Sequence, residues 1–166
     1  MTLAREMALE SEYVMGTFAR KPVEFVEGHG MTLIDDAGNE YLDFLSGIGV
    51  CSLGHCHPSI VQAVSDQAAK LIHVSNYYYI EHRGEVAQLL SNMLNAYVDE
   101  PSPETWKTFF ANSGAEANEC AIKLARLYAR RRTEAAGKDA ELAPRLIVTL
   151  AKSFHGRTLA TLAATA

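Results

Sequence analysis

The chain has 166 residues, of which 48% are hydrophobic and 21% charged, with a formal net charge of −5 and three cysteines. These values fit a globular protein with a core, and an acidic chain without a basic stripe argues against nucleic acid as the main partner. No stretch approaches the roughly 20 apolar residues that a membrane span requires. The odd number of cysteines, without framework spacing, suits the cytoplasm, where we place the protein.

The first third of the sequence predicts an arm followed by a small sheet. Residues 1–20 read as an amphipathic segment, which local sequence indicates to be a loosely held terminus. Apolar and polar residues then alternate over 23–27, 31–35 and 40–44, with glycine-bearing turns between them. This pattern predicts a three-stranded antiparallel meander. We assign residues 1–55 to the arm and this meander.

A glycine-spaced loop follows at residues 46–50, where the main chain can approach a ligand closely. Two cysteines and two histidines come next within a short stretch: Cys51, His55, Cys56 and His57. Their spacing fits no common structural zinc pattern, and no second pair follows at a suitable distance. We therefore expect no metal site, and instead a turn that leads into a helix near Pro58.

The remainder, residues 56–166, reads as the first part of an α/β domain. Helical periodicity marks residues 60–71 and 86–94. Apolar runs at 105–111 and 145–150 predict buried strands. A helix follows each run, and the second helix is still in its first turns at Ala166. The pattern is that of a mostly parallel sheet with crossover helices.

The junction between the first apolar run and its helix predicts an anion site. Ser113 and Glu116 stand in the spacing of a capping box, so the helix is expected to begin at Ser113. The first N–H groups of such a helix and its dipole point at one position, which suits a phosphate or a carboxylate. The alternative is that these residues merely cap the helix, and local sequence leaves both open.

A second element, Ser153–Thr158, follows the apolar run at 145–150. It supplies an aromatic ring, an imidazole, a glycine and an arginine at the edge where open α/β sheets bind ligands. Core packing of Phe154 and a surface salt bridge for Arg157 are the alternatives. Together with the anion site, this set suits a phosphorylated aromatic cofactor beside an amino-acid substrate.

Four blocks of the sequence, taken in this order, resemble those of a known family: YLDFLSGIGVCSLGHCHP, HVSNYYY, FFANSGAEANECAIKLAR and SFHGRT. The chain resembles the class III pyridoxal-phosphate aminotransferases of fold type I, and within them the acetylornithine aminotransferase group. The resemblance implies an α/β fold in which the small domain's antiparallel meander precedes the large, mostly parallel domain. It also implies the cofactor pyridoxal 5′-phosphate and a homodimer. Because fold type I chains are more than twice as long, we expect this chain to be an N-terminal part.

The resemblance assigns roles to two sets of residues. Those matching the family's cofactor contacts are Ser113, Gly114, Ala115, Phe154 and His155. Those matching its substrate contacts are Arg157, Ile48 and Val50. The family's ornithine enzymes typically have a tyrosine at the position of Ile48. An apolar residue there offers no partner to a free ammonium group, which favours an N-acylated substrate.

Two requirements of the family's chemistry are missing from the sequence. None of the six lysines lies in the context of the lysine that bonds covalently to the cofactor, and the aspartate that binds the pyridine nitrogen is also absent. We therefore expect no catalytic residue in this segment. The complete protein is predicted to transaminate N2-acetyl-L-ornithine with 2-oxoglutarate, in arginine biosynthesis. Succinylornithine, succinyldiaminopimelate or 4-aminobutyrate are alternative substrates, and a non-catalytic phosphate-binding fragment is the alternative of another class. No G-x-G-x-x-G motif supports a dinucleotide site.

Overall fold

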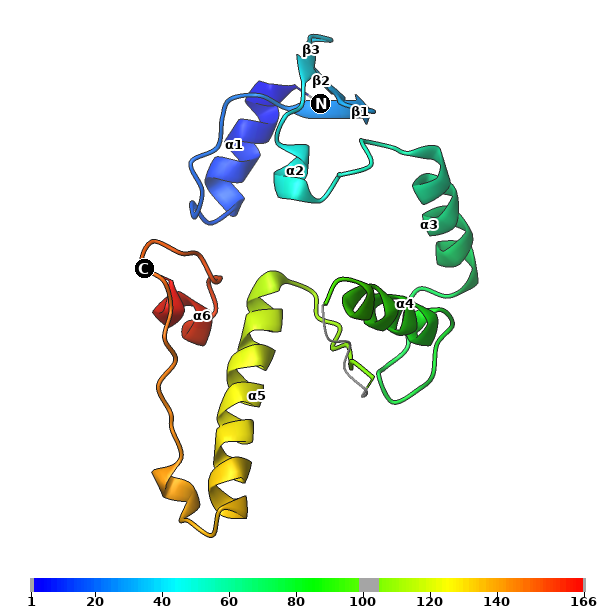
Figure 1. Cartoon of the computed structure of the whole chain (residues 1–166). Helices are drawn as coiled ribbons and strands as arrows, with labels where there is room; N and C mark the ends of the chain where they lie inside the picture. The colour runs from blue at the N-terminus through cyan, green and yellow to red at the C-terminus, as the bar shows by residue number, and fades with distance from the viewer. Residues whose placement is uncertain (1, 99–104, 166) are drawn as a thin grey trace. The chain divides into compact units, whose positions relative to one another are not determined.

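The computed structural model describes residues 2–98 and 105–165. The chain divides into two units, Met1–Tyr78 and Tyr79–Ala166, here called the N-terminal and the C-terminal unit. Each unit is described by itself (Figure 1). The domain boundary that the sequence suggests after residue 55 refers to the complete fold, and it stays a prediction.

The N-terminal unit begins with helix α1 (Leu3–Tyr13) and continues into a three-stranded sheet. Its strands are β1 (Phe25–His29), β2 (Thr32–Asp35) and β3 (Glu40–Leu42), paired antiparallel in the order β1-β2-β3. The predicted meander is thereby confirmed, with strand ends displaced by about two residues, as is usual for sequence patterns. Helix α3 (Pro58–Lys70) has its proline in the first turn, as predicted.

The loop after β3 is held in an unusual conformation. The four residues of the short turn α2 (Ser46–Gly49) all have positive φ, and Ile48 lies at φ 63° and ψ 48°, in the left-handed region. Asp43 fixes the start of this loop, because its Oδ1 accepts hydrogen bonds from the N–H groups of Leu45 (2.7 Å) and Ser46 (2.9 Å). The glycine-spaced loop that the sequence predicts is thus a left-handed turn.

Asp43 also fixes the residues that follow the loop. Its Oδ2 lies 2.6 Å from His55 Nε2, and the main chain of His55 exchanges two hydrogen bonds with Gly30, of 2.7 and 3.0 Å. His55 is therefore a partner of a carboxylate. Within residues 2–98 and 105–165, no group of histidine, cysteine and acidic side chains could hold a metal ion.

Replacing Asp43 by asparagine is expected to lower the free energy of unfolding at neutral pH. Hydrogen bonds from His55 and from the Ser46 and Leu45 N–H groups lower the pKa of Asp43. A carboxyl group with a lowered folded pKa stabilises the protein above its unfolded pKa, about 3.9 for aspartate, and the effect is lost as the pH falls through the folded value. The difference in unfolding free energy between wild type and D43N should therefore be largest at pH 7 and should disappear as the pH falls below the folded pKa of Asp43.

Denaturant unfolding at a series of pH values measures this difference. Asp66→Asn is the matched control, because Asp66 lies exposed on α3, where its Oδ1 accepts a hydrogen bond from Gln62 Nε2. A difference between wild type and D43N that is constant from pH 7 to pH 3 would contradict the assigned role of the carboxylate.

The described residues of the C-terminal unit include four helical segments. They are α4 (Arg83–Ala96), α5 (Gly114–Ala135), the 3-10 turn η1 (Ala140–Leu142) and α6 (Leu159–Ala164). After α5 the chain passes through η1 and runs back beside α5, so that α6 lies next to the N-terminal half of α5 (Figure 1). This return path brings residues 153–158 to the start of α5.

The two segments that the sequence predicts as strands, 105–111 and 145–150, form no β-ladder within the described residues. An extended segment becomes a strand only when a neighbour accepts and donates its main-chain hydrogen bonds. Neither segment is the other's neighbour, and the described part of the chain offers no third segment. The expected parallel sheet is therefore not formed by these residues, although both segments lie outside the helices as predicted.

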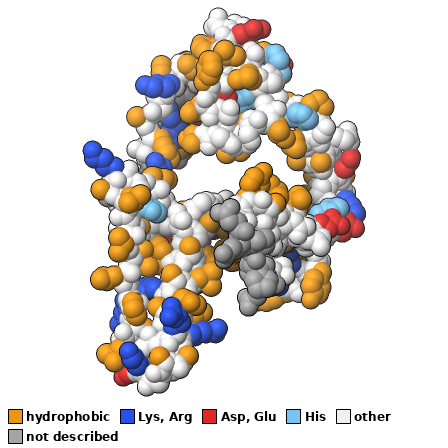
Figure 2. Space-filling view, viewed as in Figure 1, with side chains coloured by type: hydrophobic (Ala, Val, Ile, Leu, Met, Phe, Trp, Pro, Cys, Tyr) orange, Lys and Arg blue, Asp and Glu red, His pale blue; other side chains and the backbone are white. Residues whose placement is uncertain are grey.

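Many apolar side chains lie at the surface of both units, and part of them are visible on the face drawn in Figure 2. None of the described hydrophobic side chains is buried. In α5, Leu124 is 57% and Tyr128 64% exposed, and Val64 of α3 is 62% exposed. Helices α3 and α5 thus present apolar faces that a larger core would bury. No helix in the described ranges is long and apolar enough to cross a membrane.

Candidate functional site

Helix α5 begins as the sequence predicts. Ser113 is its N-cap, with extended backbone, and its Oγ accepts a hydrogen bond from the N–H of Glu116 (3.2 Å). The Glu116 carboxylate reaches back one residue further than in a standard capping box, to the N–H of Asn112 (2.7 Å), and lies 3.3 Å from Ser113 Oγ. The start of α5 is therefore fixed by two side chains.

Two N–H groups at this helix end remain open to a ligand. Gly114 and Ala115 are the first residues of α5, and their N–H groups have no acceptor among the described residues. The hydrogen bonds from the side chain and main chain of Asn112 lower the pKa of Glu116, so this carboxylate stays charged and complements the helix dipole. Two adjacent open donors at the positive end of a long helix can bind a phosphate.

Gly156 places the second predicted element directly on this helix end. It is buried, has φ 133°, and a Cβ at its position would lie 2.6 Å from Ala115 Cβ and 2.7 Å from Thr161 Oγ1. Only glycine combines this backbone conformation with this closeness. The structure thus brings Ala115 of the predicted phosphate cradle into contact with the loop that carries Phe154, His155 and Arg157.

Hydrogen bonds hold the same loop in place. Asn118 Nδ2 donates to the carbonyl oxygen of His155 (2.7 Å), and the His155 N–H donates to Thr165 Oγ1 (3.0 Å). Phe154 projects outward, with 68% of its surface exposed, and the Arg157 guanidinium carbon lies 5.8 Å from the centre of its ring. An aromatic face and a guanidinium therefore lie together at the end of α5 that bears the open donors.

These residues fit a phosphorylated aromatic cofactor. The open N–H groups of Gly114 and Ala115 suit the phosphate, the exposed ring of Phe154 offers a face to stack against, and Arg157 suits a carboxylate. Ile48 and Val50 belong to the N-terminal unit, where they are 84% and 80% exposed. Their role as substrate contacts stays a prediction.

Sequence reasoning missed the polar residues that join α5 to the loop and to α6. Asn118, Glu119 and Thr165 all bond to residues 155–160, yet none belongs to the predicted site. A signal was present: in α5, Asn118 and Glu119 lie three and four residues after Ala115, and therefore on the same side of the helix as Ala115. Two polar residues on a face that carries small residues indicate a contact with main chain.

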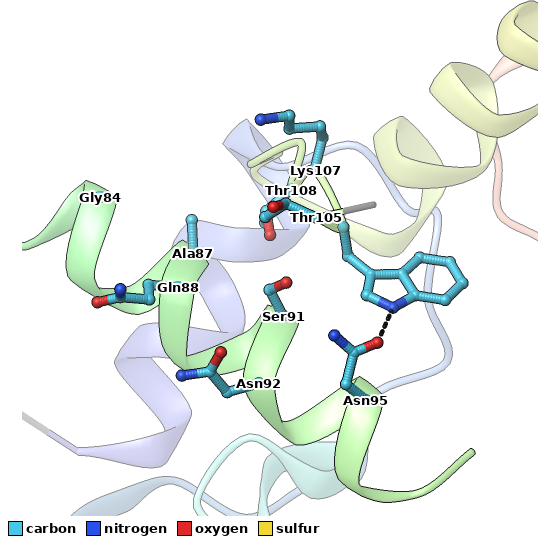
Figure 3. Close-up of a pocket in the computed structure, with 10 residues that line it drawn as sticks. Gly84, Ala87, Gln88, Ser91, Asn92, Asn95, Thr105, Lys107 and Thr108 are labelled. Atoms are coloured by element: carbon cyan, nitrogen blue, oxygen red, sulfur yellow. Dashed lines mark hydrogen bonds between the residues drawn. The ribbon is translucent and has the colours of Figure 1, made fainter. Parts of the chain in front are cut away.

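A separate pocket of about 550 Å³ lies in the C-terminal unit between α4 and residues 105–108. Polar side chains of α4 line one side of it, among them Gln88, Ser91 and Asn92 (Figure 3). Trp106 Nε1 donates to Asn95 Oδ1 (2.7 Å) at its edge. Lys107 is the charged side chain among the described residues that line this pocket, and none of the predicted site residues lines it. The pocket is therefore separate from the predicted site.

Comparison with known proteins connects these features to one family. The family model described as aminotransferase class-III matches residues 17–166. The acetylornithine aminotransferase of Nitrosomonas europaea is 49% identical over 153 residues, which cover 92% of this chain and 35% of that protein. The chain spans about a third of the length of the curated relatives that it matches.

Solved structures agree with the sequence comparison. The acetylornithine aminotransferase of Elizabethkingia anophelis matches with a TM-score of 0.73 and 32% identity, covering 95% of this chain and 36% of that one. The taurine:2-oxoglutarate aminotransferase of Bifidobacterium kashiwanohense, solved in complex with pyridoxal phosphate and glutamate, matches with a TM-score of 0.74 and 28% identity, covering 99% and 33%. The predicted fold type and family are confirmed. The chain belongs to the class III aminotransferases, a family of transferases whose indicated cofactor is pyridoxal 5′-phosphate.

Proposed function

We propose that the complete protein containing these residues exchanges the terminal amino group of N2-acetyl-L-ornithine for the oxo group of 2-oxoglutarate, as a step of arginine biosynthesis. The names of the relatives, at up to 49% identity, support this substrate. The observation that carries the proposal is the close contact between Gly156 and Ala115. This contact puts a guanidinium and an aromatic face beside an anion-binding helix end.

Each residue of the site has a distinct task in this proposal. The phosphate is held by the N–H groups of Gly114 and Ala115 and by the Ser113 hydroxyl. To bind the phosphate, the Ser113 hydroxyl gives up its hydrogen bond to the Glu116 carboxylate. Phe154 stacks on the cofactor ring, next to His155. Arg157 pairs with the substrate α-carboxylate through its planar fork of donors. When bound, pyridoxal phosphate supplies the electron sink of the reaction.

Ile48 and Val50 supply apolar surface for the acyl end of the substrate. An isoleucine cannot accept a hydrogen bond from an unmasked ammonium group, whereas an N-acyl group needs no such partner. The complete protein should therefore turn over N2-acetyl-L-ornithine with a higher kcat/KM than L-ornithine. Succinylornithine, succinyldiaminopimelate and 4-aminobutyrate belong in the same assay as the competing substrates. A preference for free L-ornithine would refute the proposed specificity.

Gly114→Asp tests the phosphate cradle without disturbing the helix. A Cβ at Gly114 meets no atom within 4 Å, and an acidic residue in the first turn of a helix is favourable. We expect the free energy of unfolding to stay equal or to rise by up to about 1 kcal/mol. The affinity for pyridoxal phosphate should fall about 100-fold or more, because like charges in contact repel by several kcal/mol.

Gly114→Asn is the matched control, since asparagine has the same size without the charge. Titration of the cofactor's visible absorbance measures both variants. Equal affinities of the two variants would remove the start of α5 from the phosphate site, and with it the main support for the proposed function.

A non-catalytic, phosphate-binding protein is the second candidate function. Its support is the start of α5, where two open N–H groups suit a phosphate whether or not a reaction follows. Intact mass of the natively expressed protein, after incubation with pyridoxal phosphate and borohydride, separates the two. A mass well above 18.2 kDa with one reduced cofactor adduct is the result expected for the aminotransferase. A mass of 18.2 kDa without adduct would support the non-catalytic protein.

We also propose a cytoplasmic homodimer. The supports are the class III family and the large apolar area that the described residues leave exposed. Sedimentation of the complete protein at several concentrations would test the stoichiometry.

A further inference from the structure

We propose that Glu119 is a positioning residue. From α5, its carboxylate caps the start of α6 and thereby fixes the position of the Arg157 guanidinium. Glu119 Oε1 accepts a hydrogen bond from Thr158 Oγ1 (2.6 Å) and a second from the N–H of Ala160 (3.2 Å). Both donors lie at the start of α6 and immediately after Arg157 in the chain. This inference rests on the proposed function, because that function assigns Arg157 to the substrate carboxylate.

Helix α6 has its own capping box, formed by Thr158 and Thr161, and Glu119 adds an acceptor for the Ala160 N–H from outside the helix. The helix has six residues, far fewer than the about 12 to 15 at which an isolated helix becomes marginally stable. The Ala160 N–H is one of the first donors of the helix, which have no acceptor within it. A carboxylate at this position satisfies the donor and also complements the positive end of the helix. Glu119 therefore ties the start of α6 to α5 (Figure 1).

Hydrogen bonds between Thr158 and Thr161 connect the Glu119 contact to a buried side chain. Thr161 is fully buried, and its Oγ1 accepts a hydrogen bond from the Thr158 N–H (3.0 Å) and lies 2.7 Å from Thr158 Oγ1. Thr158 Oγ1 donates to Glu119, and the Thr161 hydroxyl also lies 3.2 Å from the carbonyl oxygen of Thr158, to which it can donate. The hydroxyl of Thr158 is thus oriented from both sides, and its main chain is fixed.

Arg157 lies between two fixed neighbours. On one side, Gly156 rests against Ala115 of the cradle, and on the other, Thr158 is bonded to Glu119. Its backbone therefore cannot shift without breaking one of these contacts. The guanidinium leaves this point toward the Phe154 ring. The planar guanidinium binds a carboxylate through two parallel hydrogen bonds of fixed geometry. A displacement of the Arg157 backbone by about 1 Å is therefore enough to weaken carboxylate binding strongly.

The alternative is that Glu119 stabilises the whole site, so that it supports phosphate binding and carboxylate binding to the same extent. The two roles differ in what they predict for the cofactor. The N–H groups of Gly114 and Ala115 precede Glu119 in α5 and do not bond to it. A positioning residue should therefore affect carboxylate binding and leave phosphate binding intact, whereas a residue that stabilises the whole site should affect both together.

The experiment compares Glu119→Ala, Glu119→Gln and the control Glu134→Ala in the complete protein. Glutamine keeps an oxygen that can accept both hydrogen bonds, so Glu119→Gln should behave within about threefold of wild type. Glu134 is also on α5, but it pairs only with Arg130 at the other end (3.1 Å). The probes are pyridoxal phosphate and glutarate, a dicarboxylate without a reacting group.

For Glu119→Ala we expect the glutarate dissociation constant to rise about tenfold or more. The affinity for pyridoxal phosphate should stay within about twofold, and KM should rise more than kcat falls. An unchanged glutarate affinity, or a parallel loss of cofactor and glutarate affinity, would overturn the proposal. If Glu119→Ala does not fold, Thr158→Val against Thr158→Ser gives the same comparison, because only serine keeps the hydroxyl. Failure of the wild-type protein to bind pyridoxal phosphate would instead refute the proposed function.

Discussion

Gly156→Ala should abolish the candidate site and destabilise the protein. The new methyl group would lie 2.6 Å from Ala115 Cβ and 2.7 Å from Thr161 Oγ1, both closer than contact distance. Overpacking of this kind costs typically about 1 to 3 kcal/mol, and a side chain at positive φ adds roughly 1 to 2 kcal/mol. We expect a loss of about 3 kcal/mol in the free energy of unfolding. Cofactor affinity should fall with it, because the loop leaves the helix end.

Denaturant unfolding and absorbance titration of the complete protein measure these two effects. Gly84→Ala is the matched control, since a Cβ at Gly84 meets nothing within 4 Å and α4 gains a better helix former. Ala115→Gly in the Gly156→Ala background should restore part of the stability, because it removes one of the two clashing groups. Additive losses in this double variant would contradict the assigned contact.

Arg157→Ala should remove the substrate carboxylate's partner while leaving the cofactor bound. Truncating one member of a desolvated charge pair costs about 2 to 5 kcal/mol, so kcat/KM should fall about 100-fold or more. Arg157→Lys should recover only a small part, since a lysine keeps the charge and loses the two-pronged geometry. Steady-state kinetics with both substrates, together with cofactor titration, give the result.

Arg130→Ala is the control for a lost surface arginine. Its guanidinium pairs with Glu134 on the exposed side of α5, so we expect kcat/KM to stay within about twofold. Equal kinetics for the Arg157 and Arg130 variants would assign Arg157 to the surface salt bridge that the sequence also allowed. Loss of cofactor affinity in Arg157→Ala would show that the arginine supports the cradle.

Much of the helical and turn structure could be predicted from local patterns. The N-cap of α5 at Ser113 follows from a serine and a glutamate three residues apart, since the Ser113 hydroxyl accepts a hydrogen bond from the Glu116 N–H within one turn. The bond of the Glu116 carboxylate to Asn112, instead of Ser113, is not part of that pattern. The meander follows from alternation and from its glycine-bearing turns. The segments 105–111 and 145–150 form no ladder within the described residues, because a strand depends on partners that local sequence does not specify.

The sequence names candidate ligand contacts but not the residues that support them. The family's blocks name Phe154 and Arg157, and their ring and guanidinium do lie together. The bonds of Asn118 and Glu119 join residues 37 to 41 positions apart, a distance over which periodicity carries no information. The closeness of Gly156 to Ala115 was also hidden, since a glycine in a loop has many ordinary explanations.

The left-handed turn Ser46–Gly49 carries a side chain that does not help the turn to fold. Ile48 is β-branched, has φ 63° and is 84% exposed, so within the N-terminal unit both its backbone conformation and its solvent exposure are unfavourable. Glycine or asparagine would be better suited to fold this turn. An isoleucine at this position therefore points to a benefit that the side chain provides outside the folding of its own unit.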